Sequence, residues 1–535
     1  MRLQDMKETS SGYPILSCKE AAEFEAAILK DEAAEWAAMQ KAGAGIARAL
    51  CCDYRELSPL PETLNILALI GKGNNGGDAL IACNQLLDKF PGSRITLLFT
   101  ADANKLRPLV SRAYEPLKGR VAHHWIRAGM DEAAIDPILD REAAGEQGFD
   151  MCIDGLLGMS FRPPVREPID ALIQAVNSFD RIKLRAAVDL PSGKGDHSDK
   201  LFFRADFTYA TGIPKKALFS ESLDCGRIRV IDLGFQRTSE CAAFSAKETV
   251  LADDALRPLR ALRPSNANKY TYGHVFIVGG SACMPGALLM AVQAAVRSGV
   301  GLVTAFAPSS VSASLAARAP EAMWVPWPER DDGTLDAEAI QLLLGRIGRA
   351  TAVLVGPGMG KGESAELIAR AIIEKVELPI VLDADALCPA VIESAAKRQK
   401  YGSGSVVLTP HTGEFTRMAK LKKKEVSNET LRAFCREFHV TTVLKGPLTR
   451  ICDGDTVRYS TLGGPVLSRG GSGDLLAGLI GGMVAQRHLD VPVALSSGVV
   501  LHGLAAERLA QEKGQVCVYT TQLLDYLPDV LRLNS

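Results

Sequence analysis

The chain has 535 residues, of which 47% are hydrophobic and 23% are charged, and its formal net charge is −1. This length predicts two or more domains, each large enough to bury its own core. A net charge near zero gives no reason to expect nucleic-acid or anionic-membrane partners. No stretch approaches the ~20 apolar residues of a membrane span, so we expect a cytoplasmic protein.

The twelve cysteines are scattered along the chain, and none of them forms a Cys-x-x-Cys pair. Most lie inside apolar runs such as Met151-Cys152-Ile153, where a thiol packs like a small apolar side chain. The spacing therefore favours buried, reduced thiols over a disulfide framework or a metal site.

The first half of the chain alternates helical patterns with buried strand patterns. Residues 17–50 carry apolar side chains at helical spacing and predict one or two amphipathic helices. A strand pattern at 65–70 runs into a glycine-rich loop at 71–78, and a helix follows at 79–87. Further strand patterns occur at residues 94–99, 150–153, 185–188 and 205–210. This alternation predicts a doubly wound, parallel α/β sheet.

Polar residues follow three of these expected strands. Asn75 and Asp78 follow the first one, while Asp154 and Asp189 each end a strand and lead into a glycine loop, the second through Ser192. Ligands of such sheets collect outside the carboxyl ends of the strands, so these five side chains should converge. A glycine loop between strand and helix suits a phosphate or a dinucleotide, and asparagine oxygens can ligate a cation.

Four motifs in this half resemble, in order, those of the NAD(P)H-hydrate epimerase domain. They are Gly-Asn-Asn-Gly-Gly-Asp at 73–78, Asp-Gly-Leu-Leu-Gly at 154–158, Asp-Leu-Pro-Ser-Gly at 189–193 and Gly-Ile-Pro-Lys at 212–215. The resemblance implies a Rossmann-like domain, for which we expect residues 1–240.

The resemblance implies a potassium ion held by Asn75, Asp154 and Ser192. It also implies that Asp189 contacts the hydrated nicotinamide nucleotide; epimerising a hemiaminal carbon moves a proton, for which Asp189 is the best-placed acid/base. Asp189 could otherwise be a strand-end cap. The substrate is expected along two segments, Asn74, Asn75, Gly76, Gly77 and Asp78, and then Gly158, Met159, Ser160, Phe161, Arg162, Pro163 and Pro164.

The chain departs from the family pattern at three places in this half. Ala79 stands where a glycine is usual, and Met159 and Lys194 are not the residues expected near the substrate. The sequence therefore leaves open whether the epimerase is fully active.

The strand pattern lapses between about residues 236 and 263, where charged, Ala-rich helix is expected. A second series of strands then begins, and each strand ends in glycine or polar residues at what should be one edge of one sheet. These strands are expected at residues 274–278, 352–355, 379–382, 405–408 and 441–444.

Residues 468–474 read Ser-Arg-Gly-Gly-Ser-Gly-Asp and precede a small apolar run that is typical of a helix. Glycines let backbone N–H groups converge on an anion, and a helix N-terminus adds partial positive charge. Asp474 in the first turn could accept a proton from a hydroxyl that attacks phosphorus, and Lys445 would supply phosphate charge. The alternative is an ordinary glycine-rich turn capped by Asp474. No Walker loop is present.

Six motifs in this half resemble the ribokinase-like superfamily, and within it the ADP-dependent NAD(P)H-hydrate dehydratase domain, for which we expect residues 241–535. They are Gly-Gly-Ser at 279–281, Gly-Pro-Gly at 356–358, Asp-Ala-Asp-Ala at 383–386, Leu-Thr-Pro-His-Thr-Gly-Glu at 408–414, Leu-Lys-Gly at 444–446 and Gly-Gly-Ser-Gly-Asp at 470–474.

This resemblance places the hydrate on Ala287, Gly358, His411 and Asp474. It places the nucleotide, ADP with Mg²⁺, on Lys445, Gly446, Pro447, Leu448, Thr449 and Gly473. The implied mechanism phosphorylates the hydrate hydroxyl, with Asp474 as the base, and then loses phosphate. His411 could instead be a satisfied loop histidine, and Asp383 with Asp385 could bind Mg²⁺ through water or cap a helix.

The two resemblances together predict a bifunctional repair enzyme for hydrated NADH and NADPH. It would epimerise the R and S forms and dehydrate the S form at the expense of ADP, giving AMP and phosphate. A vitamin or sugar kinase with a non-catalytic first domain is the competing enzyme, and a scaffold protein is the competing class. The sequence leaves open ADP against ATP and the preferred hydrate, and we expect a homo-oligomer of undetermined size.

Overall fold

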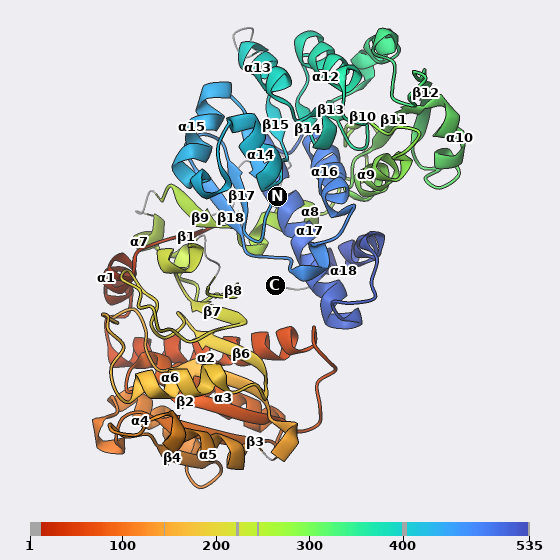
Figure 1. Cartoon of the computed structure of the whole chain (residues 1–535). Coiled ribbons are helices and arrows are strands. Elements are labelled where there is room, and N and C mark those ends of the chain that lie inside the picture. The colour runs from red at the N-terminus through yellow and green to blue at the C-terminus, as the bar shows by residue number, and fades with distance from the viewer. Residues whose placement is uncertain (1–11, 144, 221–223, 243–245, 399–403, 533–535) are drawn as a thin grey trace. The chain divides into compact units, whose positions relative to one another are not determined.

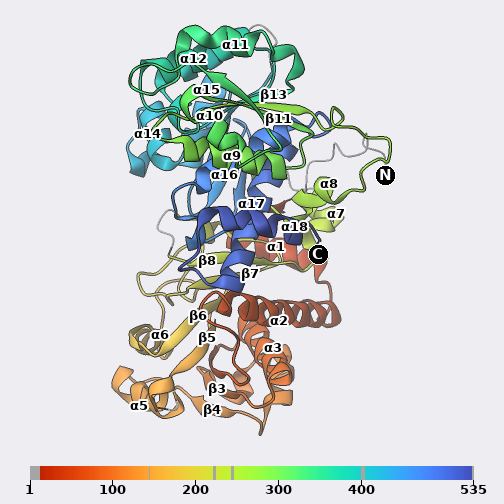
Figure 2. The same cartoon turned by 90° about the vertical axis from the view of Figure 1, so that its right-hand side faces the viewer.

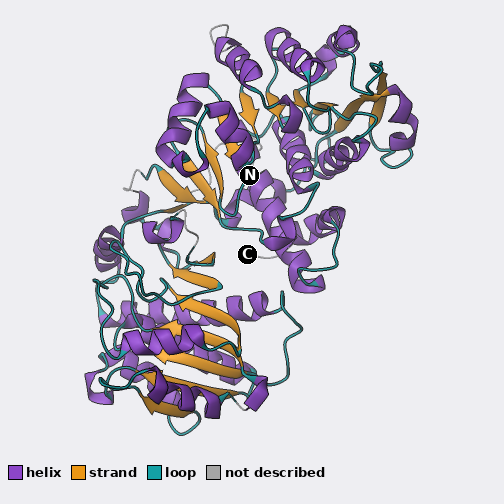
Figure 3. Cartoon of the chain, in the orientation of Figure 1, coloured by secondary structure: helices purple, strands orange, loops and turns teal. Residues whose placement is uncertain are grey.

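The computed structural model describes residues 12–143, 145–220, 224–242, 246–398 and 404–532. The chain divides into two compact units, Tyr13–Ala246 and Lys247–Ser535, and Gly12 belongs to the second. Each unit contains a sheet of mostly parallel strands with helices beside it (Figures 1 and 3). The predicted α/β class is therefore confirmed for both halves of the chain.

The N-terminal unit is built on a parallel sheet of strand order β4-β3-β2-β5-β6-β7-β8. Its strands are β2 (Asn65–Ile70), β3 (Arg94–Phe99), β4 (Ala122–Trp125), β5 (Phe149–Gly155), β6 (Ile182–Val188), β7 (Phe207–Thr211) and β8 (Arg227–Ile231), and the short strand β1 (Tyr13–Pro14) is not part of this sheet. Its helices are α1 (Cys18–Ile28), α2 (Glu32–Tyr54), α3 (Asn74–Lys89), α4 (Pro108–Tyr114), α5 (Glu132–Glu142), α6 (Ile169–Ser178) and α7 (Ser239–Ala242).

Both faces of this sheet are covered, as the alternation of side chains along β2 shows. Ile66, Ala68 and Ile70 belong to the apolar cluster of α2, α3 and α4. Leu67 and Leu69 belong to a second cluster with α5 and α6. Figure 2 shows α2 and α3 on one side of the strands and α5 and α6 on the other. Successive residues of a strand point to opposite faces, so an unbroken apolar strand such as β2 requires helices on both.

The C-terminal unit has the strand order β9-β18-β17-β16-β15-β14-β13-β10-β11-β12, with β17 antiparallel to both of its neighbours. The strands are β9 (Glu248–Val250), β10 (His274–Val278), β11 (Leu302–Pro308), β12 (Met323–Trp327), β13 (Ala352–Val355), β14 (Ile380–Leu382), β15 (Val406–Leu408), β16 (Thr441–Leu444), β17 (Thr449–Cys452) and β18 (Val457–Ser460). The helices are α8 (Arg257–Arg260), α9 (Pro285–Arg297), α10 (Ser309–Ala316), α11 (Gln341–Leu344), α12 (Glu363–Lys375), α13 (Pro389–Arg398), α14 (Thr412–Ala419), α15 (Asn428–Phe438), α16 (Ser472–Val484), α17 (Val491–Lys513) and α18 (Leu527–Arg532).

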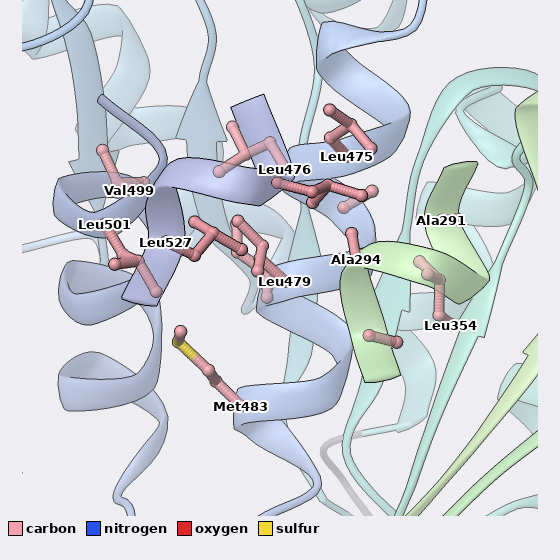
Figure 4. Packing of buried hydrophobic residues seen from close by; sticks show 14 of the residues in the cluster. Ala291, Ala294, Leu354, Leu475, Leu476, Leu479, Met483, Val499, Leu501 and Leu527 are labelled. Carbon is pink, nitrogen blue, oxygen red and sulfur yellow. The ribbon is translucent and has the colours of Figure 1, made fainter. Parts of the chain in front are cut away.

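Helix α16 lies in the core of this unit. Its residues from Leu475 to Val484 are all buried, and Leu479 and Met483 pack among α9, α17 and α18 (Figure 4). Gly478 lets α9 approach closely, because a Cβ there would lie 2.1 Å from the Ala291 carbonyl oxygen. A helix enclosed in this way has a fixed N-terminus, so residues 470–474 are held rigidly at its start.

Several local predictions need correction. Helix α3 begins at Asn74, so the Asn-Asn-Gly-Gly-Asp string forms its first turns and is not the loop expected at 71–78. Gly73 is the N-cap, and the following glycines fit under neighbouring backbone; a Cβ on Gly76 would lie 2.2 Å from the Gly71 carbonyl oxygen. The helix expected between 236 and 263 is replaced by short elements and strand β9.

The cysteines agree with the expectation of reduced thiols, since all twelve are free and most are buried. Among the described residues, no group of three or more His, Cys, Asp and Glu side chains could hold a metal ion. No described helix is long and apolar enough to cross a membrane.

Candidate active sites

In the N-terminal unit, the carboxyl ends of β5 and β6 bring Asp154 and Ser192 together. Asp154 is buried, and its carboxylate accepts hydrogen bonds from the Ser192 hydroxyl (2.7 Å), the Ser192 N–H (2.8 Å) and the Leu156 N–H (3.2 Å). Burial raises the pKa of Asp154 to about 6, although these hydrogen bonds lower it. The partners are neutral, so the site retains an uncompensated carboxylate.

Asn75 completes this group from the first turn of α3. Its Nδ2 donates to the carbonyl oxygens of Leu157 (3.0 Å) and Val188 (2.9 Å), so both amide hydrogens are used and Oδ1 remains as an acceptor. A Cβ on Gly158 would lie 2.7 Å from that Oδ1, and glycine therefore keeps the space beside it open. The Leu157 N–H donates to Ser192 Oγ (2.9 Å), which ties the three side chains into one continuous group.

Asp189 lies at the same edge of the sheet in a strained backbone conformation. Its φ is 65°, a value that residues other than glycine adopt at a cost and mostly at functional positions. The carboxylate accepts hydrogen bonds from Lys215 Nζ (2.5 Å), Thr211 Oγ1 (3.0 Å) and the Thr211 N–H (3.1 Å). It therefore does bond the end of β7, as the capping alternative foresaw, but it also forms a buried ion pair.

Two further carboxyl groups, those of Glu25 and Asp78, lie around this Lys215–Asp189 ion pair. Lys215 is fully buried, and its Nζ also lies 3.9 Å from Glu25 Oε1. Burial alone would lower the pKa of Lys215, but Asp189 and Glu25 raise it above its ordinary value. Burial, with the charges of Asp189 and Glu25, raises the pKa of Asp78 well above its usual range. The raised pKa favours the protonated form of Asp78.

The segment that follows β5 presents mainly backbone to this edge. The Phe161 ring is buried in the cluster between the sheet and α6, so it does not face a ligand through its side chain. Ser160, Arg162, Pro163 and Pro164 are exposed, and Met159 is half-buried against the apolar cluster of α1.

The departures from the expected pattern have structural partners. Ala79 packs against Gly155, where an added Cβ would lie 2.8 Å from the Ala79 Cβ, so the larger residue on one side is matched by the smallest on the other. Lys194 is paired with Asp224 (3.0 Å) and lies 3.7 Å from the centre of the Phe202 ring. Both side chains are accommodated without disturbing Asn75 or Asp154.

In the C-terminal unit, Gly471 is the N-cap of α16 and has a φ of 90°, which requires glycine. The Ser472 hydroxyl donates to the Leu467 carbonyl oxygen (2.7 Å), and the Arg469 guanidinium donates to the Val518 carbonyl oxygen (2.7 Å). These bonds anchor the glycine-rich turn on both sides. Arg469 and Ser472 are therefore part of its scaffold.

Lys445 reaches this helix terminus from the end of β16. A Cβ on Gly473 would lie 3.1 Å from Lys445 Nζ, so the ammonium group stands directly beside the first turn of α16. Lys445 Nζ also donates to Asp383 Oδ1 (2.8 Å), which accepts from Thr409 Oγ1 as well (2.7 Å). The side chain of Asp383 makes no capping bond, so the capping alternative is wrong for this residue.

Asp474 lies in the first turn of α16 within this field of charges. Burial and the Asp383 charge together raise the pKa of Asp474 to about 6, and the Lys445 charge opposes this shift. Asp385 lies nearby and accepts the Gly360 N–H (2.9 Å). A carboxyl that titrates near neutral pH, beside a lysine and a helix N-terminus, is suited to exchange a proton with a phosphate acceptor.

His411 is the N-cap of α14. Its Nδ1 accepts hydrogen bonds from the N–H groups of Gly413 (3.0 Å) and Glu414 (3.3 Å). This ring nitrogen is therefore satisfied, as the loop-histidine alternative expects. The ring is still 61% exposed, and His411 pairs with Lys445 in a short parallel bridge. Ala287 and Gly358 also lie together, since a Cβ on Gly358 would be 2.9 Å from the Ala287 Cβ.

The remaining residues expected to contact the nucleotide are Gly446, Pro447, Leu448 and Thr449, which follow β16. It connects β16 to β17, and the Thr449 hydroxyl donates to the Gly446 carbonyl oxygen (3.3 Å).

Two side chains that the structure places at the first site, Lys215 and Glu25, were not predicted as site residues from the sequence. Lys215 was recognised only as part of a motif, although a lysine at the end of a strand on the functional edge was a usable signal. Glu25 gave no signal, since it lies on an amphipathic helix among several exposed glutamates.

The first unit holds a carboxylate–hydroxyl–amide group, and the second holds a lysine at a glycine-rich helix N-terminus. Two α/β units with such sites define an enzyme of the nucleotide-binding α/β class. The family model described as YjeF-related protein N-terminus matches residues 36–217, and the model described as NAD(P)H-hydrate dehydratase matches residues 275–529.

Curated relatives extend the match over nearly the whole chain. Bifunctional NAD(P)H-hydrate repair enzymes from Moorella thermoacetica and Coxiella burnetii are 31% and 32% identical; the matches cover 87% and 94% of this chain and 87% and 96% of those proteins. The chain belongs to the family of bifunctional NAD(P)H-hydrate repair enzymes.

Among solved structures, an ADP/ATP-dependent NAD(P)H-hydrate dehydratase from Bacillus subtilis, co-crystallised with ATP and Mg²⁺, is similar to part of the chain. It is 28% identical with a TM-score of 0.44, and the match covers 52% of this chain and 97% of that one. A ribokinase-like superfamily protein from Enterococcus faecalis is 27% identical with a TM-score of 0.45, covering 54% and 97%.

Proposed function

We propose that this chain repairs hydrated NADH and NADPH in two steps. The first unit interconverts the R and S forms, and the second dehydrates the S form at the expense of ADP, giving AMP and phosphate. The observation that carries the proposal is the placement of Asp474 and Lys445 together at the N-terminus of α16, in a chain that also holds the Asn75–Asp154–Ser192 group. We assign the first step to residues 1–240 and the second to residues 241–535.

The oxygen atoms of Asn75, Asp154 and Ser192 fit a potassium ion. One buried carboxylate and two neutral oxygens are hard ligands with little net charge, which suits a monovalent cation. The ion would supply positive charge next to the substrate segments Asn74–Asp78 and Gly158–Pro164.

The acid–base groups of the first step are Asp189 and Asp78. Asp189 is held by Lys215 and Thr211, so its carboxylate has a fixed position at the carboxyl edge of the sheet. The raised pKa of Asp78 favours its protonated form, which can give its proton to the departing hydroxyl of the hydrate. The hydroxyl then leaves as water and the ring nitrogen forms a cationic C=N bond. Water adds to the opposite face and returns a proton to the carboxylate, so atoms and charge balance.

For the second step, the N–H groups of Gly471, Ser472 and Gly473 would hold the transferring phosphoryl group at the start of α16. Asp474 would take the proton of the hydrate hydroxyl as the oxygen attacks phosphorus, and Lys445 would balance phosphate charge. Ala287, Gly358 and His411 would contact the hydrate, and residues 445–449 with Gly473 the nucleotide. Asp383 and Asp385 are oxygen donors that could hold the Mg²⁺ of ADP through water.

Membership of the repair family favours this function over a vitamin or sugar kinase, which would release a phosphorylated product. The cytoplasmic location and the homo-oligomer expected from the sequence stay predictions.

The test is recovery of reduced-nicotinamide absorbance from a mixture of both hydrate epimers, with ADP and the purified chain. Complete recovery that disappears in Asp474→Asn is the expected result, because both epimers must pass through the second step. Recovery that stops at the share of one epimer would refute the epimerase role. No recovery with either ADP or ATP would refute the repair function as a whole.

A further inference from the structure

Glu25 on α1 is the one carboxylate at the Asp189–Lys215 pair that none of the four sequence motifs contains, and it precedes the residues matched by the family model. Its Oε1 lies 3.9 Å from Lys215 Nζ, and its side chain is 23% exposed whereas Lys215 and Asp189 are almost completely buried. Glu25 therefore connects a buried ion pair to solvent.

The charges of this cluster do not cancel when Glu25 is ionised. Lys215 carries one positive charge and already donates to Asp189 Oδ1. Asp78, from α3, adds a carboxyl whose pKa is raised well above its usual range by burial and by the charges of Asp189 and Glu25, so it contributes no positive charge. An ionised Glu25 makes the cluster net negative, whereas a protonated Glu25 leaves the Lys215–Asp189 pair neutral. The protonation state of Glu25 thus decides the net charge that this cluster presents to a ligand.

We propose that Glu25 is a positioning residue of the N-terminal site: acting through Lys215, its carboxylate makes the cluster net negative and so stabilises the cationic species formed during epimerisation. This inference rests on the proposed epimerase function. A net negative cluster of side chains in a region of low dielectric attracts a developing positive charge more strongly than water does. The carboxylate need not touch the substrate to have this effect.

The surroundings of Glu25 place its titration in the working pH range. Burial raises the pKa of Glu25 to about 7; the Lys215 charge lowers it and the Asp189 charge raises it. Other titratable groups near α1 are Asp78 on α3, Cys18 on α1 itself, Asp196, Lys216 beside Glu20, and Cys241 on α7. Asp196 and Lys216 contact the first turn of the helix.

The test is the epimerase rate of the full chain between pH 6 and pH 8, for wild type, Glu25→Gln, Glu25→Asp and Glu23→Gln. Glu23 is a matched control two residues away, with a side chain that is 67% exposed and an Oε1 that lies 3.9 Å from Lys19 Nζ. The wild-type kcat should rise through about pH 7 as Glu25 ionises. Glu25→Gln should lack this rise and be about tenfold slower at pH 8, which corresponds to a loss of about 1.4 kcal/mol of transition-state stabilisation. Glu25→Asp should restore the rise in part.

The melting temperature separates this role from a structural one. A carboxyl with a raised pKa in the folded state contributes stability that is fully present below its unfolded pKa and lost as the pH rises through about 7. Glu25→Gln mimics the protonated form, so it should melt higher than wild type at pH 8 and equally at pH 4. A purely structural glutamate would give a variant that melts lower at pH 8.

Three results would overturn the inference. They are equal pH profiles for Glu25→Gln and Glu23→Gln, a Glu25→Gln variant that is slower than wild type even at pH 6, where wild-type Glu25 is mostly protonated, and a Glu25→Gln variant that melts lower than wild type at pH 8. A wild-type chain that dehydrates the S form but does not epimerise would instead refute the proposed function of this unit, and the inference with it. That outcome is distinguished because it appears before any variant is made.

Discussion

The charge of Asp383 should set the pH at which the dehydratase loses activity in acid. Asp474 must be ionised to accept a proton, and its pKa is raised to about 6, first by burial and then by the Asp383 charge. With that value, about 90% of Asp474 is ionised at pH 7 and about 10% at pH 5. The wild-type kcat should therefore fall about ninefold across this range through this one group.

Asp383→Asn should move this acid limb to lower pH. The substitution removes the repulsion between Asp383 and Asp474, and it also frees Lys445, whose Nζ now lies 2.8 Å from Asp383 Oδ1, to attract Asp474 more strongly. Both effects favour the ionised form of Asp474. The expected displacement is about one pH unit, the usual effect of one neighbouring charge.

The assay is kcat for the S hydrate with saturating ADP from pH 4.5 to pH 8, read as reduced-nicotinamide absorbance. The maximal rate can fall in Asp383→Asn without affecting the test, because only the midpoint of the limb is compared. Asp385→Asn should move the midpoint in the same direction but less, since Asp385 raises the pKa of Asp474 by a smaller amount. Asp529→Asn, on the exposed face of α18, is the control. A midpoint that is unchanged in Asp383→Asn, or that moves upwards, would refute the coupling of these groups.

Two further predictions concern the core and the first site. Gly478→Ala should lower the stability of the C-terminal unit by about 1–3 kcal/mol, because the new methyl would lie 2.1 Å from the Ala291 carbonyl oxygen. Its melting temperature should fall accordingly. Gly481→Ala is the control and should melt close to wild type, since its Cβ would meet the Leu354 side chain at 3.2 Å. Asp154→Asn should abolish epimerisation and its response to K⁺ while dehydration of the purified S hydrate continues; epimerisation that remains and still responds to K⁺ would contradict the assignment.

The strands could be predicted where a continuous apolar run ends at a polar residue. β2, β3, β10, β13 and β16 begin and end at the predicted residues, because a strand buried on both faces leaves no other reading of such runs. β4 was missed, since its sequence Ala-His-His-Trp lies at an edge of the sheet and is partly exposed.

The start of α3 could not be predicted from intrinsic propensity. Asparagine and glycine are poor helix formers, so Asn-Asn-Gly-Gly-Asp looked like a loop. In the structure, tertiary contacts override this preference: Gly76 fits against the Gly71 carbonyl oxygen and Gly77 fits against Met39, positions that a larger residue could not occupy. The same closeness lets Asn75 reach the ends of β5 and β6.

The site residues that end strands could be predicted, because parallel strands share one carboxyl edge. Glu25 could not, since its role depends on α1 lying over Lys215, and helical periodicity does not say which tertiary neighbour an exposed-looking glutamate meets.

Both units use the same electrostatic arrangement although their chemistry differs. In each, a lysine at the end of a strand pairs with one buried aspartate, Lys215 with Asp189 and Lys445 with Asp383. A second carboxyl near the pair has no lysine of its own, and burial raises its pKa, well above the usual range for Asp78 and to about 6 for Asp474. Neighbouring carboxyls placed in such different surroundings take different roles. Asp189 and Asp383 are each held in place by a lysine, whereas the raised pKa of Asp78 and of Asp474 favours the protonated form of those two carboxyls.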